Sequence, residues 1–188
     1  MAGHEAGDVY VSTDIQLLKA RKFAPDITLR AAIKTASGGS FEKARYYDNP
    51  GYFFDLSVGK SLYFAKGKTF PYADATDAKV ELRFAGSAGF LCWQTDNGRQ
   101  NDAVMYGLQM LLKSEYVSVR AVWSGYVGWE KDGDRPMTIK VRLAGHVKGF
   151  EPFAEYQYGI KDYPFHQMRV GLAYNIHVPT LMKYGKKP

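Results

Sequence analysis

The chain has 188 residues, a formal net charge of +6 at pH 7, and aromatic side chains at 15% of its positions. This length fits one domain, and we expect residues 1–188 to form a single one. Lys and Arg are spread singly along most of the sequence, which argues against a nucleic-acid partner. The single cysteine, Cys92, excludes an intrachain disulfide.

Polar and apolar residues alternate along nine segments of the chain. A period of two is that of a β-strand, whereas a helix has a period of 3.6. The connections between the segments carry Gly, Pro or charge, so consecutive strands are expected to form an antiparallel meander. In chain order, the predicted strands are 9–18, 26–35, 52–62, 79–90, 104–113, 116–127, 137–147, 153–160 and 165–176.

The segment "MTIKVRLAGHV" (137–147) shows the alternation most clearly. Ile139, Val141 and Leu143 fall on one parity, and Lys140 and Arg142 fall on the other. In a soluble protein the apolar parity packs on a core. In a membrane barrel it meets lipid, and the charged parity lines the lumen. The choice between these two arrangements decides the class of protein.

Strand length and composition favour the membrane arrangement. A strand of about 11 residues, tilted by about 40°, spans roughly 27 Å, close to the apolar band of an outer-membrane barrel. Aromatic residues gather near the predicted strand ends, as in an interfacial girdle. Short and long connections tend to alternate, although 63–78 is too long for that scheme. Small residues on the polar parity leave room in a narrow lumen, namely Gly59, Ala85, Gly107, Gly159 and Gly171.

The first predicted hairpin carries a resemblance to a known family. The stretch "GDVYVSTDIQLLKARKFAPDITLRAAIKTASGG" resembles the first hairpin of porin-like outer-membrane β-barrels of Gram-negative bacteria. "GYFFDLSVGKSL" and "FHQMRVGLAYNI" are similar to closing strands of such proteins. The resemblance implies a location in the bacterial outer membrane. Within residues 7–38 it rests on Gly7, Asp8, Leu17, Leu18, Pro25, Lys34 and Gly38.

Two features depart from that family. Single-chain bacterial barrels have an even number of strands, whereas nine are predicted here, and "NIHVPTLMKYGKKP" continues past the last one. The opening "MAGHEAGDVY" is no signal peptide, because it has neither a basic nor an apolar region. Either one strand is misassigned, or a signal peptide or an N-terminal strand is missing from the chain.

We therefore expect an all-β, antiparallel, up-and-down transmembrane β-barrel of about 8–10 strands in a bacterial outer membrane. A structural role or a narrow porin or binding role is expected, with no catalysis, cofactor or metal. The expected partners are membrane lipid and, because bases outnumber acids on the polar parity, small anionic solutes. The residues expected to line the lumen are Asp14, Arg30, Lys34, Asp55, Glu81, Arg83, Arg120, Lys140, Arg142, Glu155 and Arg169.

Two alternatives remain open. A soluble, calycin-like barrel would turn Val141 and Leu143 inward around an apolar small molecule. A hydrolase would need a nucleophile within reach of a base, and strand offsets allow a contact between Ser124 and His146. No pair of histidines has metal-ligand spacing. The polar loop at 94–103 could hold a sugar or a cation, and "DGD" (132–134) is a weak match to a calcium loop.

Overall fold

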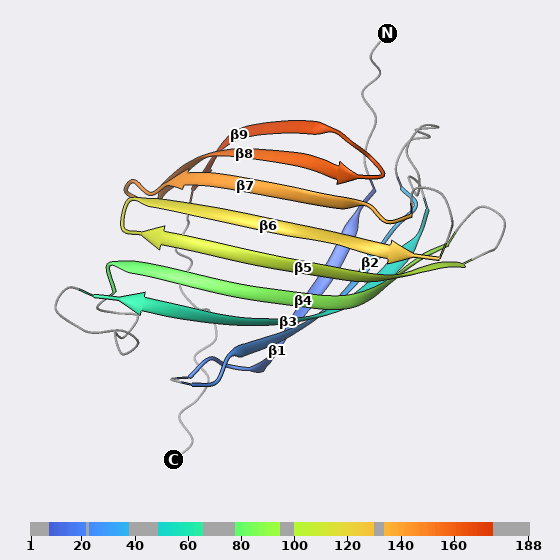
Figure 1. The fold of residues 1–188 in the computed structure, drawn as a ribbon, viewed down its shortest axis with the longest axis horizontal. Coiled ribbons are helices and arrows are strands. Elements are labelled where there is room, and N and C mark those ends of the chain that lie inside the picture. Colours follow the sequence, from blue (N-terminus) through green and yellow to red (C-terminus); the bar gives the residue numbers. More distant parts are fainter. Residues whose placement is uncertain are drawn as a thin grey trace, which may run out of the picture.

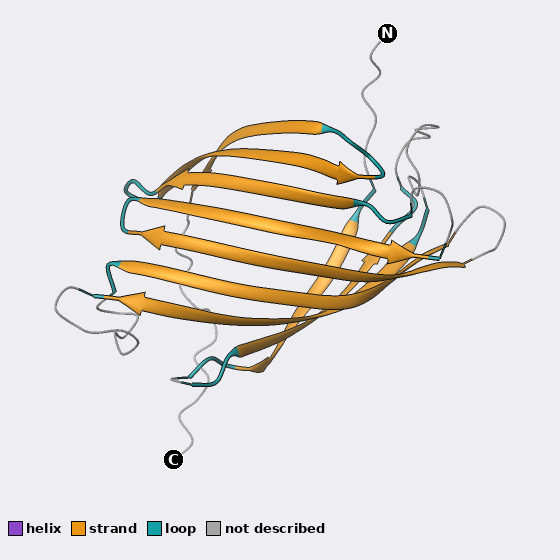
Figure 2. Cartoon of the chain, viewed as in Figure 1, coloured by secondary structure: helices purple, strands orange, loops and turns teal. Residues whose placement is uncertain are grey.

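The computed structural model describes residues 8–21, 23–37, 49–65, 78–94, 100–129 and 134–174. These residues form nine β-strands, and no helix among them is long and apolar enough to cross a membrane (Figure 2). The strands are β1 (Tyr10–Leu18), β2 (Asp26–Lys34), β3 (Gly51–Phe64), β4 (Val80–Gln94), β5 (Gln100–Ser114), β6 (Val117–Gly128), β7 (Met137–Gly145), β8 (Phe150–Lys161) and β9 (His166–Tyr174).

All nine strands belong to one sheet in which each pairs antiparallel with its neighbours in sequence, in the order β1 to β9 (Figure 1). The sheet is open within the described residues, because β1 pairs only with β2 and β9 pairs only with β8. The prediction of an all-β antiparallel meander is confirmed. Because direction alternates, the two edge strands run the same way.

The predicted strand positions are confirmed, but several boundaries are wrong. β4 and β5 pair without interruption from Val80 opposite Ser114 to Gln94 opposite Gln100. Of the predicted polar loop at 94–103, residues 94 and 100–103 are therefore strand, and 95–99 lie outside the described residues. β8 likewise begins at Phe150, three residues before its predicted start. Backbone pairing continues past the point where the side-chain alternation fades.

The strand registers define two faces of the sheet. One face carries Arg30, Asp55 and Gly89, which lie in one row across β2, β3 and β4. We call it the inner face. Lys34, Asp55 and Glu155 are on this face and are only 5%, 9% and 9% exposed. Among the described residues no second layer covers the sheet. The inner side chains are therefore buried by one another, as expected where a sheet curls toward that face.

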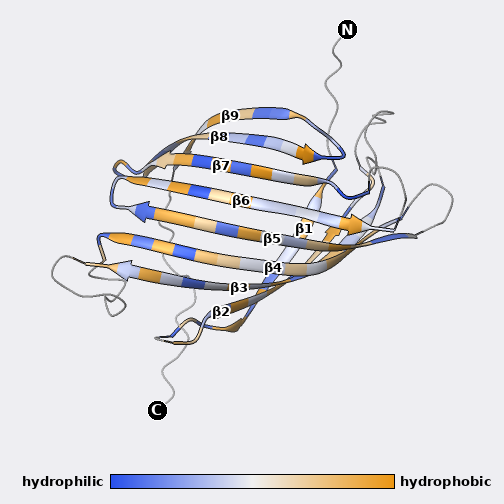
Figure 3. Ribbon diagram, in the orientation of Figure 1, coloured by the Kyte–Doolittle hydropathy of each residue, from blue (hydrophilic) through white to orange (hydrophobic). Residues whose placement is uncertain are grey.

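The opposite parity forms the outer face, which is apolar and open. Leu108, in the middle of β5, is 57% exposed, and Val170 in β9 is 76% exposed. Figure 3 shows the resulting alternation of hydrophilic and hydrophobic positions along the strands. Charged side chains are thus buried and aliphatic side chains exposed, which is the reverse of the usual distribution in a soluble protein.

Glycines on the inner face let side chains cross a strand. A Cβ on Gly59 of β3 would collide with the guanidinium of Arg83 and the carboxylate of Asp26, which meet over it. A Cβ on Gly171 of β9 would collide with the ring of Phe153. These small residues make room for partners on either side, as the sequence pattern predicted.

Candidate functional site

Charged residues are concentrated on the inner face, and this face is the candidate functional site. The registers place all of the predicted lumen-lining residues on it, alternating with the outer apolar positions. In the order of strands β1 to β9 they are Asp14, Arg30, Lys34, Asp55, Glu81, Arg83, Arg120, Lys140, Arg142, Glu155 and Arg169.

The most buried ion pair joins Lys34, at the end of β2, to Asp8, before β1. Their side chains are each 4% exposed, and the ammonium nitrogen lies 2.5 Å from Asp8 Oδ2. The same nitrogen donates to the carbonyl oxygen of Asn49 and lies 5.5 Å from the ring centroid of Trp93. The pair ties the chain before β1 to strands β2 and β4.

Two further cationic side chains on strands β2 and β4 are paired. Arg30 donates to both carboxylate oxygens of Asp14, at 2.7 and 3.0 Å. Arg83 donates to Asp26 at 2.9 Å across the gap left by Gly59. Over this half of the sheet the predicted basic residues are thus neutralised by neighbouring acids.

A second set of pairs lies on β7, β8 and β9. The guanidinium of Arg142 donates to Glu151 at 2.9 Å and lies 3.8 Å from the ring centroid of Phe153. Arg169 donates to Glu155 at a longer 3.5 Å. Both arginines therefore have an acidic neighbour on β8.

Arg120 and Lys140 differ from the other predicted basic residues. In the described part of the chain neither has a hydrogen bond or an ion pair with any other described residue. Arg120 lies directly opposite Arg142 in the register of β6 and β7, and Lys140 is two residues from Arg142 on the same face. Among the predicted lumen-lining residues, the bases without an ion-pair partner in the described part of the chain are thus Arg120 on β6 and Lys140 on β7.

Sequence reasoning missed the acids Asp8, Asp26 and Glu151, which pair with Lys34, Arg83 and Arg142. Each lies at a predicted strand start or within two residues before it. Continuing the strand alternation to these positions would have placed them on the same face as the bases. These three acids equal the whole excess of bases over acids among the predicted lumen-lining residues. Any preference for anions must then come from the local arrangement around Arg120.

His146, which follows β7, lies close to two polar side chains. Its Nε2 is 3.1 Å from Ser118 Oγ, and its Nδ1 is 3.7 Å from Glu151 Oε2. The contact with Ser124 that the strand offset allowed is not formed, because Ser124 Oγ instead lies 3.4 Å from Thr138 Oγ1. Register explains the difference, since β6 pairs Ser124 with Thr138 and brings Ser118 to the end of β7.

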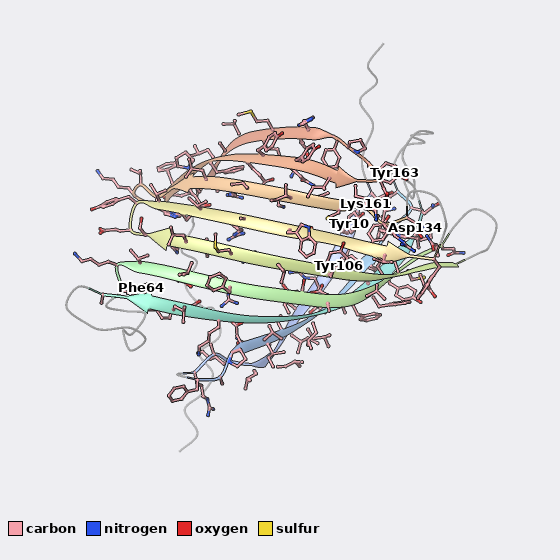
Figure 4. All side chains as sticks on the ribbon, in the orientation of Figure 1. Tyr10, Phe64, Tyr106, Asp134, Lys161 and Tyr163 are labelled. Carbon is pink, nitrogen blue, oxygen red and sulfur yellow. The ribbon has the colours of Figure 1, made fainter. Side chains whose placement is uncertain are left out.

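The far end of the sheet holds a buried acid that sequence reasoning treated as part of a calcium-like loop. Asp134 is 1% exposed, and the amide of Asn101 donates to its carboxylate at 3.4 Å. Figure 4 shows Asp134 and Tyr163 near one end of the sheet and Phe64 at the other. Residues 132 and 133 lie outside the described part. Among the described residues, no group of three or more His, Cys, Asp or Glu side chains is placed to hold a metal ion.

An apolar hollow lies on the outer face over Gly86. Its walls include Leu56, Leu108 and Trp123, all of the outer parity. His166, at the start of β9, is exposed on this face with Nδ1 2.6 Å from the hydroxyl of Tyr156. The hollow therefore opens on the same side as the exposed aliphatic band.

Comparison of the chain with protein-family models, with curated proteins and with solved structures gives no match. The candidate site is therefore interpreted from its own geometry.

Proposed function

We propose that this chain is a transmembrane β-barrel protein of the bacterial outer membrane. Its outer face meets lipid, and its inner face lines a narrow polar lumen with a structural, diffusion or binding role. One observation carries the proposal: aliphatic side chains such as Leu108 and Val170 are exposed while Lys34 and Glu155 are buried. Water would penalise that outer face, whereas lipid would solvate it.

Strand length supports the proposal. β4 and β5 each have 15 residues, and β6 and β8 each have 12. Strands of globular proteins average about 5–6 residues, and a tilted strand needs about 9–11 to cross a bilayer. Every central strand of the sheet is therefore long enough to span the apolar layer.

Closure is the step that turns this sheet into a barrel. A lipid-exposed edge would leave backbone groups without hydrogen-bond partners, so a spanning sheet must close. Since β1 and β9 run in the same direction, joining them directly needs a parallel pair. An antiparallel closure needs one more strand from outside the described residues.

The test of this function is the ion selectivity of the full chain in planar bilayers. In a gradient of potassium chloride we expect a reversal potential that favours chloride, because Arg120 and Lys140 on the inner face have no ion-pair partner among the residues that the structure describes. Replacing both by glutamate is expected to reverse the sign. A parent protein that conducts and favours potassium would contradict the predicted anion preference.

A second candidate function rests on the contacts of His146. The two contacts of His146 follow the order of a serine hydrolase triad. Ser118 would be the nucleophile, His146 the general base, and Glu151 the carboxylate that orients the imidazole. In this scheme Ser118 Oγ would attack an ester carbonyl and pass its proton to His146, which would give it to the departing alcohol as the ester C–O bond breaks. Water, giving a proton to His146, would then attack the acyl-serine, and Ser118 would regain the proton as the acid is released. Against it, Glu151 also accepts a hydrogen bond from Arg142 at 2.9 Å.

Hydrolysis of a short-chain p-nitrophenyl ester by the refolded chain tests this second candidate. If it is correct, Ser118→Ala and His146→Ala should each lower the rate by at least about a thousandfold. Ser124→Ala serves as the matched control, since Ser124 does not contact His146. Equal rates in all three variants and the parent would exclude catalysis at this site.

A further inference from the structure

The inner wall formed by β6 and β7 carries positive charge that the described residues do not neutralise. Arg120 and Arg142 are direct register partners on paired strands. Like charges at opposite positions of an antiparallel pair destabilise it. We therefore expect a further group to compensate for the repulsion between Arg120 and Arg142.

The guanidinium of Arg142 is already occupied on the side of β8. It donates to Glu151 and stacks on Phe153, so it is drawn away from β6. Arg120 has no comparable partner among the described residues and is exposed. Its guanidinium is therefore available to a ligand on the inner face.

Lys140 completes the arrangement. On the inner face it lies two residues from Arg142 and diagonally from Arg120, because its own register partner on β6 is Val122. Diagonal positions are about 7–8 Å apart, within reach of long side chains. The nearest acid, Glu155, lies opposite Arg142 and is bonded to Arg169, while Gln157 lies opposite Lys140.

From this placement we infer an oxyanion-binding site at Arg120 and Lys140, with phosphate-class anions as its ligands. A guanidinium offers two parallel donors that match two oxygens of one anion, and an ammonium adds a point charge. A tetrahedral anion with more than one negative charge can accept from both groups at once. Arg142 contributes attraction through its charge without releasing Glu151. The inference rests on the proposed function, because the polar lumen gives solutes access to this wall.

Titration calorimetry of the full chain with inorganic phosphate, in micelles of an uncharged detergent, tests the site. We expect saturable binding in the parent and an affinity about tenfold weaker in Arg120→Gln and in Lys140→Gln. Arg135→Gln is the matched control, because it removes the same charge from an exposed side chain outside the strands. No binding by the parent, or equal weakening by the control, would overturn the site.

Thermal unfolding separates ligand binding from a structural role of Arg120. Phosphate should raise the unfolding temperature of the parent and have little effect on Arg120→Gln. Without phosphate, Arg120→Gln should be no less stable than the parent, because it removes a like-charge opposition. A variant that is destabilised without phosphate would assign Arg120 a structural role and refute the site.

The two proposals fail in different ways. Phosphate binding that depends on Arg120, together with no conductance in bilayers, would refute a diffusion role and leave the site intact. A chloride-selective current that neither phosphate nor Arg120→Gln changes would refute the site alone.

Discussion

Replacing Lys34 by methionine is expected to destabilise the folded protein by about 3–5 kcal/mol, the largest effect of any inner-face substitution considered. Lys34 and Asp8 are each 4% exposed, so the variant removes the Lys34 ammonium from beside the buried Asp8 carboxylate. It also removes the donor to Asn49 and the cation that lies over Trp93. The measurement is the free energy of unfolding in urea with the protein in micelles.

The matched control is Arg30→Met, which breaks another ion pair of β2. The side chains of Arg30 and Asp14 are 47% and 50% exposed, so solvent screens their attraction and the loss should be far smaller. Combining Lys34→Met with Asp8→Leu should recover most of the stability, because two apolar side chains can replace a buried pair. Equal losses for Lys34→Met and Arg30→Met would contradict the burial described for Lys34.

Placing glutamate at Leu108 is expected to destabilise the protein in a lipid bilayer by about 2 kcal/mol or more. Leu108 is near the middle of β5, on the outer face, and is 57% exposed. If that face meets lipid, the new carboxylate is transferred into hydrocarbon. Unfolding of the bilayer-inserted protein by urea measures the loss.

The control for this prediction is the same substitution three residues away on the same strand. Leu111 lies on the inner face, directly between Arg83 and Arg120 in the strand register. A glutamate there faces two guanidiniums, so Leu111→Glu should be neutral or stabilising. If Leu111→Glu is the more destabilising of the two, the assignment of the faces is reversed.

The nine strands and their two faces could be predicted from the sequence because both depend on a local pattern. Residues such as Lys140 and Arg142 alternate with Val141 and Leu143, and a period of two fixes which side chains share a face. The open or closed state of the sheet could not be predicted in this way, since it depends on how the edge strands β1 and β9 meet.

The partners of the charged residues could not be predicted, because they depend on register between strands. Arg83 reaches Asp26, 57 residues earlier, only because β2, β3 and β4 align with Gly59 between them. His146 contacts Ser118 and not Ser124 for the same reason. A different register between two strands that kept the same faces would have changed these contacts without changing the sequence pattern.

Refolding of the full chain with and without detergent micelles tests the central claim most directly. Heat-modifiable migration on a gel, compared for boiled and unboiled samples, reports whether a resistant barrel has formed. We expect folding only in micelles, with a shift between boiled and unboiled protein, because the exposed aliphatic band needs an apolar solvent. A monodisperse protein that folds in plain buffer would contradict the account. Val141 and Leu143 would then belong to a core around an apolar ligand, as in the soluble alternative.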